Sequence, residues 1–174
     1  MNPFAIVPNG PSSAGKTSIA RAIQSLAGTP VLHASLDTFT DMFHWPAIPD
    51  GNEKGECHRF GVANFHATLP LLASSRFPVV IDHVFERRDW LEATQAALSG
   101  KRVYFVAVRC PIAVLEERER SRGDRRVGMA RSQVDRVHVG VPYATEVDTS
   151  THSPEECADA ILRFVEQAEA AVSS

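Results

Sequence analysis

The sequence has no uninterrupted apolar run near the roughly 18 residues that a membrane span needs. It has no basic excess either, since its formal net charge is −3, and this argues against broad nucleic-acid binding. Its three cysteines are far apart and form no C-x-x-C, which favours reduced thiols over a disulfide framework. The start of the chain lacks the pattern of a signal peptide. We therefore expect a cytoplasmic protein that binds neither membranes nor nucleic acid, in an oligomeric state that the sequence leaves open.

The length and composition predict one globular domain over residues 1–174. A chain of 174 residues is within the usual size of a domain, and 44% apolar and 22% charged residues are ordinary values for a globular protein. Apolar runs typical of strands alternate with helical patterns. The expected strands are Phe4–Val7, Val31–Leu36, Pro78–Ile81, Arg102–Val108 and Thr145–Asp148. The expected helices are Lys16–Ala27, Arg87–Leu98, Ile112–Arg120 and a last one that begins at a capping box, Ser153 with Glu156. This alternation predicts an α/β fold with a parallel sheet flanked by helices.

Residues Gly10–Thr17 match the phosphate-binding pattern G-x-x-x-x-G-K-[ST], between a strand pattern and a helical pattern. The backbone N–H groups of such a loop turn toward an anion, and the next helix points its positive end at it. We expect the loop to bind a nucleoside triphosphate, with Lys16 reaching the β- and γ-phosphates and Thr17 binding Mg²⁺. The expected nucleotide contacts are Gly10, Ser12, Ser13, Ala14, Gly15, Lys16, Thr17 and Ser18.

Two carboxylates, Asp37 and Asp82, follow predicted strands at the edge where ligands of α/β sheets bind. Asp82 is placed to hold Mg²⁺ directly or through water. Asp37 is placed to accept a proton from an attacking hydroxyl. Helix capping is the alternative role for each of them. Phe39 and Met42, just after Asp37, are expected to hold the acceptor beside it.

Two segments depart from the alternation. Thr38–Phe65 is expected to be irregular, and we interpret residues 38–66 as the acceptor-binding segment. Arg118–Arg131 contains six arginines and two acids, and we interpret residues 118–131 as a lid over the triphosphate. Arg122 and Arg125 are expected to stabilise the charge that spreads over the transferring phosphoryl group, and Arg126 to contact the nucleotide. Arg118 and Arg120 are expected on a solvated helix face.

The histidines do not predict a metal site. The spacings of His44, Cys57, His58 and His66 match no usual zinc pattern. We expect local hydrogen bonds at His83, His138 and His152. His83 follows Asp82 directly, so it is a candidate for mutation near the phosphates.

Several further segments join the phosphate loop in one recognisable set. They are Asn9-Gly10, the Asp37 segment, Ile81-Asp82 with Val84-Phe85, Val108-Arg109-Cys110, Arg122–Arg125 with Gly128-Met129-Ala130, Val137-His138 with Gly140-Val141 and Tyr143, and Glu146–Thr149. With this set the chain resembles the chloramphenicol phosphotransferase family of antibiotic-modifying kinases over nearly its whole length. The family's pair of acids after the third strand appears here as Asp82-His83, and Ala144 stands where the family usually has an acid.

The resemblance implies a five-stranded parallel sheet of the P-loop nucleoside-kinase type with an Arg-rich lid. It also implies ATP- and Mg²⁺-dependent phosphorylation of the primary hydroxyl of chloramphenicol, and hence antibiotic resistance, with Asp37 as base. Lys16 would contact the phosphates, and Arg122 and Arg125 would be lid arginines. Two alternatives stay open: a kinase for another small metabolite or nucleotide, and a nucleotide-dependent switch that transfers no phosphoryl group.

Overall fold

The computed structural model describes residues 4–122 and 128–172, and of Arg122 only the backbone. Five parallel strands form one sheet in the order β2-β3-β1-β4-β5. The strands are β1 (Phe4–Asn9), β2 (Leu32–Ser35), β3 (Val79–Asp82), β4 (Arg102–Arg109) and β5 (Tyr143–Asp148). All five lie within two residues of the predicted positions, so the parallel α/β sheet is confirmed.

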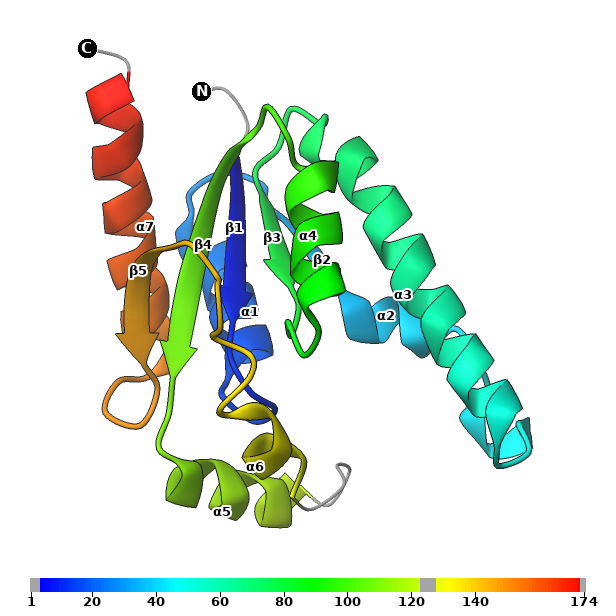
Figure 1. Cartoon of the computed structure of the whole chain (residues 1–174). Helices are drawn as coiled ribbons and strands as arrows, with labels where there is room; N and C mark the ends of the chain where they lie inside the picture. Colours follow the sequence, from blue (N-terminus) through cyan, green and yellow to red (C-terminus); the bar gives the residue numbers. More distant parts are fainter. Residues whose placement is uncertain (1–3, 123–127, 173–174) are drawn as a thin grey trace.

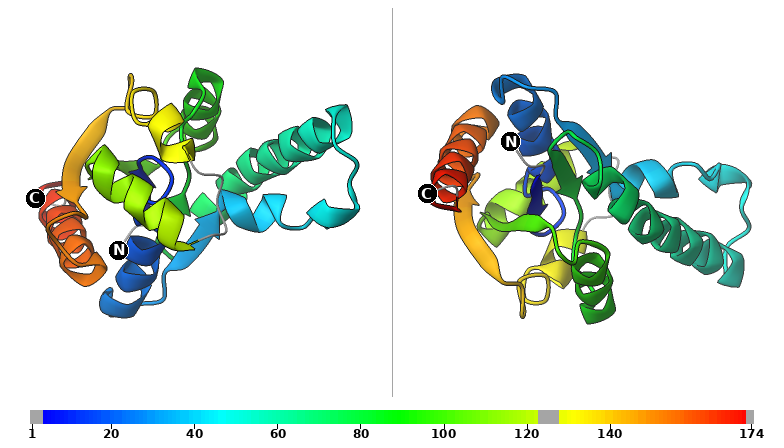
Figure 2. Two further views of the ribbon diagram at one scale, coloured as in Figure 1. Left: turned by 90° about the horizontal axis from the view of Figure 1, so that it is seen from below. Right: turned by 90° about the horizontal axis from the view of Figure 1, so that it is seen from above.

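Helices cover both faces of this sheet (Figures 1 and 2). They are α1 (Lys16–Leu26), α2 (Leu36–Thr40), α3 (Asn52–Ala73), α4 (Arg88–Ala97), α5 (Ile112–Arg122), α6 (Met129–Gln133) and α7 (Pro154–Val172), with a 3₁₀ turn η1 (Trp45–Ala47). The predicted capping box opens α7, because the Ser153 N–H donates to Glu156 Oε2 and the Glu156 N–H donates to Ser153 Oγ. Within the described part of the chain, no helix combines the length and apolarity that a membrane crossing requires.

The alternation of β1 side chains divides the core into two clusters. Ile6 packs on one face with residues of α1 and α7, such as Ile23 and Ile161. Ala5 and Val7 pack on the other face with residues of α3 and α4. A central parallel strand that is buried on both faces needs this continuous apolar sequence. The two clusters fix β1, and with it the loop that follows Asn9.

The strands bring the candidate residues to one edge of the sheet, because all carboxyl ends of a parallel sheet point the same way. The phosphate loop follows β1, Asp37 follows β2, and Asp82 ends β3. Ser35 and Asp82 are neighbours in the register of β2 and β3. The edge is therefore assembled from segments far apart in the sequence.

The irregular structure expected over Thr38–Phe65 is wrong for its second half. Helix α3 runs for 22 residues from Asn52 and projects from the body as an arm, with α2 and η1 leading to it (Figure 1). Its buried positions Gly61, Val62, Phe65, Leu69 and Ala73 follow helical spacing, which tertiary packing stabilises despite the internal Gly and Pro residues.

Close packing of α2 against α3 anchors the base of this arm. A Cβ at Gly61 would lie 3.2 Å from Thr40 Cγ2, so the absence of a side chain at residue 61 lets α2 pack closely on α3. The ring of Phe39 packs edge-on against Phe65, with centroids 5.4 Å apart.

Candidate active site

The phosphate loop has the backbone geometry of an anion cradle. Ser13 and Gly15 both have positive φ, 62° and 90°, and Gly15 is the N-cap of α1. The first N–H groups of α1, from Lys16 onward, have no acceptor within the helix, and the helix dipole adds positive potential there. The hydroxyl of Ser13 is buried without a hydrogen-bond partner among the described residues. A phosphate oxygen at this loop would satisfy these donors.

Buried side chains hold this loop in place. Lys16 is 7% exposed, and its ammonium donates to the Pro11 carbonyl at 2.9 Å. The Ser12 N–H donates to Oε1 of buried Gln133, whose amide nitrogen donates to Glu86. Helix α6 therefore contacts the phosphate loop directly through Gln133.

Asn9, at the end of β1, joins three segments of the edge. Its amide nitrogen donates to the Val137 carbonyl and to the Tyr143 hydroxyl, both at 2.6 Å, and its carbonyl oxygen accepts the Phe85 N–H at 3.0 Å. The Tyr143 oxygen also lies 2.6 Å from His138 Nδ1. Burial raises the pKa of Tyr143 to about 12, and burial with the nearby charge of Arg109 lowers the pKa of His138 to about 4. Neutral His138 therefore accepts a hydrogen bond from the Tyr143 hydroxyl, which keeps its proton, and this is the local hydrogen bond expected for His138.

Thr17 and Asp82 meet at the expected Mg²⁺ position. Thr17 Oγ1 donates to Asp82 Oδ2 at 2.6 Å, and His33 Nε2 lies 3.5 Å from the same oxygen. Burial works to raise the pKa of Asp82, but the polar contacts with His33 and Thr17 and the charge of Lys16 outweigh it and lower the pKa below its ordinary value. Asp82 is thus an ionised carboxylate beside a hydroxyl, and hard oxygens of this kind fit Mg²⁺. The described residues contain no group of three or more His, Cys, Asp or Glu residues arranged for a metal.

A cleft of about 190 Å³ joins these groups to the other candidate residues. Asp37 lines it from the first turn of α2, where Ser35 and not Asp37 is the N-cap. Phe39 and Met42 do not line it: Phe39 packs against Phe65, and Met42 is 71% exposed. The structure therefore brings Asp37, but not the two predicted acceptor-binding residues, to the phosphate loop.

Of the predicted nucleotide contacts in the loop, Gly10 and Ala14 do not line the cleft. The wall residues that sequence reasoning missed as contacts include Glu86, Trp90, Met129 and Gln133.

His83 is buried beside Asp82 and is engaged at both ring nitrogens. Its Nδ1 accepts the Val84 N–H at 2.9 Å, so the ring proton of neutral His83 lies on Nε2. That nitrogen lies 3.0 Å from Nε2 of His66, which must accept. Burial and the neighbouring His66 lower the pKa of His83 to about 3. Neither nitrogen of His83 is therefore open to a metal ion.

The predicted lid is only partly visible. Arg125 and Arg126, and the side chain of Arg122, lie outside the described residues. Of the flanking residues, Glu119 is fully buried and accepts the N–H groups of Gly128 and Ala130. This carboxylate fixes the end of α5 to the start of α6, so both ends of the predicted lid rest on defined structure.

The expectation that Arg118 lies on a solvated face is wrong. Its guanidinium donates to the Thr149 carbonyl at 2.6 Å, to Thr149 Oγ1 at 3.0 Å and to the Ser13 carbonyl at 3.3 Å. The signal was its position three residues after buried Leu115, which places it on the edge of the inward face of α5. Arg120 is exposed and pairs with Glu117, as expected for a solvated residue.

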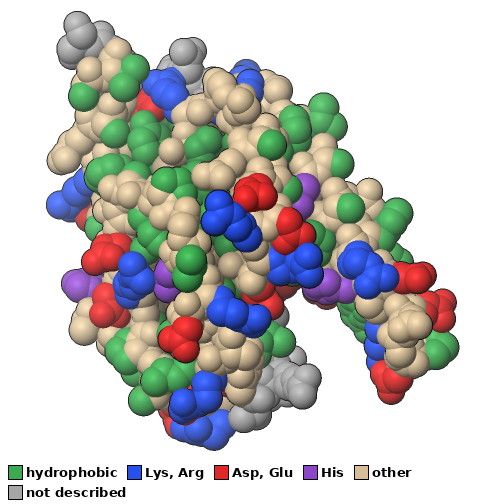
Figure 3. Space-filling model, viewed as in Figure 1, with side chains coloured by type: hydrophobic (Ala, Val, Ile, Leu, Met, Phe, Trp, Pro, Cys, Tyr) green, Lys and Arg blue, Asp and Glu red, His purple; other side chains and the backbone are tan. Residues whose placement is uncertain are grey.

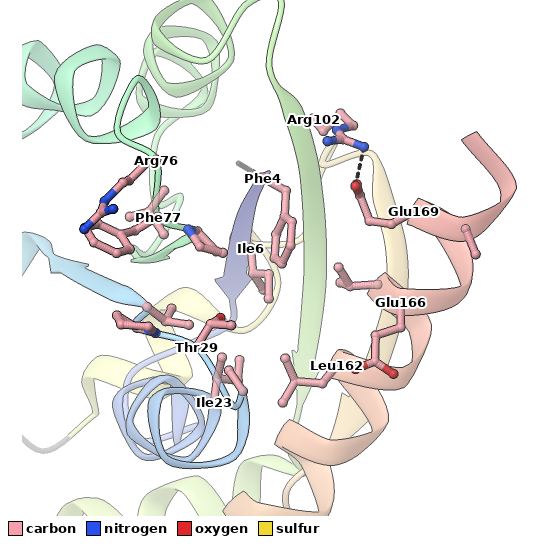
Figure 4. Close-up of a pocket in the computed structure, with 17 residues that line it drawn as sticks. Phe4, Ile6, Ile23, Thr29, Arg76, Phe77, Arg102, Leu162, Glu166 and Glu169 are labelled. Atoms are coloured by element: carbon pink, nitrogen blue, oxygen red, sulfur yellow. Dashed lines mark ion pairs between the residues drawn. The ribbon is translucent and has the colours of Figure 1, made fainter. Parts of the chain in front are cut away.

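Other hollows lie outside the cleft. One of about 500 Å³ adjoins the phosphate loop and is lined by Arg118, Thr149 and His152, among others. A larger one, about 1070 Å³, lies at the opposite end of the sheet, where Ile6 and Leu162 line its floor and Arg102 pairs with Glu169 (Figure 4). This larger hollow is remote from the phosphate loop and contains none of the candidate site residues.

Comparison with solved structures identifies the type of fold. Among solved structures, the chain is similar to a gluconokinase from Sinorhizobium meliloti (TM-score 0.70, 20% identity, 99% of this chain and 97% of that one). It is also similar to the Mycobacterium tuberculosis APS kinase in complex with AMPPNP and APS (TM-score 0.70, 13% identity, 95% and 98%). These likenesses show the fold of P-loop kinases.

Sequence comparison identifies the family. The chain is 28% identical over 180 residues to a Mycobacterium tuberculosis protein provisionally named an O-phosphotransferase. The matched region covers 88% of this chain and 78% of that protein. The sequence profile of the chloramphenicol phosphotransferase-like proteins matches residues 4–166. The chain therefore belongs to the chloramphenicol phosphotransferase-like family, a phosphotransferase family built on the P-loop kinase fold.

Proposed function

We propose that the protein transfers the γ-phosphoryl group of ATP, as its Mg²⁺ complex, to a hydroxyl of a small molecule, in the manner of a chloramphenicol 3-O-phosphotransferase. The observation that carries the proposal is the single cleft that joins the anion cradle, the Thr17–Asp82 pair and Asp37. These are the three parts that phosphoryl transfer to an alcohol needs: a phosphate grip, a metal position and a carboxylate for the attacking hydroxyl.

The nucleotide end of this site is assigned to the phosphate loop and the hollow beside it. The backbone of residues 12–18 and the ammonium of Lys16 would bind the phosphates. The hollow of about 500 Å³ adjoins the loop on the side of Arg118 and Thr149, which suits the nucleoside. Arg122, Arg125 and Arg126 are proposed to close over the phosphates from the lid.

Thr17 and Asp82 would hold Mg²⁺, which neutralises charge on the phosphate oxygens when it is bound. On the acceptor side, Asp37 accepts a hydrogen bond from the attacking hydroxyl and orients its oxygen. Because phosphoryl transfer has a loose transition state, this orientation contributes more than early removal of the proton. Lys16, at the other end of the cleft, stabilises charge on the transferring group.

The test is an ATP-consumption screen with chloramphenicol and a panel of hydroxylated metabolites and nucleotides, run beside a thermal-shift assay. ATP with Mg²⁺ is expected to raise the melting temperature, because a ligand that binds only the folded state stabilises it. At least one hydroxyl compound should accelerate ATP turnover and appear as a phosphate ester. ATP turnover that no hydroxyl compound changes would contradict the proposal and favour a nucleotide-dependent switch.

A further inference from the structure

A groove of about 570 Å³ runs between α3 and α4, and His58 and Trp90 line both this groove and the phosphate cleft. Figure 3 shows histidine and basic side chains gathered at the notch between the arm and the body of the molecule. Pockets for small ligands have volumes of roughly 300–1,000 Å³. The cleft, at about 190 Å³, is smaller than this range. An acceptor of ordinary size with its hydroxyl at Asp37 would need space beyond the cleft, and the groove past His58 and Trp90 adjoins it.

The indole of Trp90 forms a flat wall of the groove, and packing against His83 fixes its position. The buried ring of His83 stacks on the indole, with centroids 5.6 Å apart and planes 22° apart. The exposed ring of His58 stands 6.0 Å from the indole centroid, at 37°. A wall that is already ordered by buried packing binds a flat group without ordering a side chain first.

His66 contributes a fixed hydrogen-bond donor to the same groove. Its Nε2 accepts from His83, so the proton of neutral His66 lies on Nδ1. His66 lines the groove, and among the described residues its Nδ1 has no hydrogen-bond acceptor. His83 thus sets both the Trp90 wall and the tautomer of His66.

The charged residues of the groove favour a ligand group that carries an anionic oxygen. Arg87 is held by Asp89 in a pair of parallel hydrogen bonds, whereas Arg59 has no acidic partner within the described parts of the chain. Gly55 leaves room for Arg59, because a Cβ there would lie 3.3 Å from Nη1. With two guanidiniums and one carboxylate, the lining of the groove carries a net positive charge. A guanidinium binds a carboxylate through charge-assisted hydrogen bonds, which are stronger than hydrogen bonds between neutral groups.

We propose that the groove between α3 and α4 is the subsite for the part of the acceptor beyond its reacting hydroxyl, and that it binds a flat group that ends in an anionic oxygen such as a carboxylate. This inference rests on the proposed phosphoryl transfer, because it places the reacting hydroxyl at Asp37. Trp90 contacts the flat face, and Arg59 and His66 bind the oxygens.

The experiment uses aromatic primary alcohols that differ only in charge. The probes are 4-(hydroxymethyl)benzoate and 4-(hydroxymethyl)benzamide, with homologues that carry additional methylenes between ring and hydroxyl. The measured quantity is the ratio of kcat/KM for acid and amide at saturating ATP and Mg²⁺. We expect this ratio to be about tenfold or more for the best chain length, which is the usual discrimination of one charge-assisted contact.

Matched variants locate the contact. Arg59→Gln is expected to reduce the acid-to-amide ratio at least fivefold, whereas Arg88→Gln should leave it unchanged, because Arg88 is on α4 outside the groove and pairs with Glu92. Trp90→Leu should lower kcat/KM for acid and amide together, and Trp90→Phe should restore most of it. Thermal melting confirms that each variant is folded.

Three outcomes would overturn the groove assignment: equal use of acid and amide, the same loss in Arg59→Gln and Arg88→Gln, or transfer to other alcohols but to no member of the series. Failure to bind ATP with Mg²⁺ in the thermal-shift assay would instead contradict the proposed function itself. The two failures are therefore distinguishable.

Discussion

The hydroxyl of Thr17 donates a 2.6 Å hydrogen bond to Oδ2 of Asp82, a residue 65 positions later in the chain. Thr17 belongs to the first turn of α1, and Asp82 is the last residue of β3. The contact holds the two side chains at the proposed metal position in the absence of ligand, so Mg²⁺ binding there would need little reorganisation.

Replacing Asp82 with Asn should separate metal binding from phosphate binding. The amide keeps the volume of the side chain but removes the charge that attracts Mg²⁺. We expect the Mg²⁺ concentration for half-maximal activity to rise at least about tenfold, while ADP without Mg²⁺ binds as before. Magnesium titrations of turnover and thermal shifts with ADP measure the two effects, and an unchanged magnesium requirement would remove Asp82 from the metal position.

Lys16→Ala should strongly weaken nucleotide binding itself. Its ammonium is buried at the phosphate loop, and a buried cation facing phosphate contributes more than a surface one. Calorimetric titration with ATP and Mg²⁺ should show a loss of about thirtyfold or more in affinity. Lys54→Ala is the control, because Lys54 is on α3 and pairs with Asp50 away from the loop. Equal affinities in wild type and Lys16→Ala would contradict the placement of the phosphates.

Asp37→Ala should lower turnover far more than ATP affinity. The carboxylate lines the cleft at the proposed acceptor position, where a positioned base contributes about 10²–10⁴-fold in rate. Single-turnover rates with an accepted alcohol, and ATP affinity from calorimetry, check the split. Asp41→Ala, at the end of the same helix α2, is a matched control that should keep full turnover. Comparable turnover in both variants would eliminate Asp37 as the base.

Gly10→Ala should destabilise the fold. A Cβ at residue 10 would lie 2.4 Å from the Val108 carbonyl oxygen, so β1 and β4 would have to shift apart. Overpacking of this kind costs about 1–3 kcal/mol of the free energy of unfolding. Gly28→Ala has open space at its Cβ and a φ of +63°, so only the left-handed backbone cost of roughly 1–2 kcal/mol applies there. Urea unfolding compares the two, and a Gly10→Ala protein as stable as wild type would contradict the close approach.

Acidification should weaken the fold between pH 6.5 and about pH 3. Burial lowers the pKa of His83 from 6.5 to about 3, so in this window the unfolded chain binds a proton that the folded chain excludes. The free energy of unfolding should fall by about 1.4 kcal/mol for each pH unit below 6.5 from this residue. Urea unfolding from pH 7 to pH 5 measures the slope.

The matched variant for the pH prediction is His83→Asn, whose carbonyl oxygen can still accept the Val84 N–H. The slope should be shallower in this variant, because the titrating ring is gone. His138, with its pKa lowered to about 4, contributes a smaller part because it is only half-buried. An equal slope in wild type and His83→Asn would assign the acid sensitivity to other groups.

The edge of the sheet was predictable from sequence because its signals are local. The glycine and lysine spacing of the phosphate loop identifies it, and the buried runs before Asp37 and Asp82 place both carboxylates at strand ends. The family resemblance found on the same segments is confirmed by the profile match. At this edge the local sequence preferences agree with the tertiary fold, which is why they could be read from the sequence alone.

The arm was not predictable in the same way, because its order depends on contacts made across the fold. Gly55, Gly61 and Pro70 lower the helix propensity of α3, and its stability comes from packing that a single sequence does not reveal. The inward turn of Arg118 likewise depends on Thr149, a partner 31 residues away. Phe39 was assigned to the acceptor from proximity in sequence, whereas the helical turn directs it onto Phe65 instead.

The three contacts of Asn9 limit how this scaffold can be re-engineered. One side chain, that of Asn9, both donates and accepts hydrogen bonds. It contacts Phe85 after β3, the turn at Val137, and Tyr143 on β5. A segment grafted here from a relative must keep the group that hydrogen-bonds with Asn9, or a buried polar group of Asn9 loses its partner. Chimeras that exchange residues 41–60, which include η1 and the first turns of α3, leave the contacts of Asn9 intact, so a changed acceptor preference is best sought there.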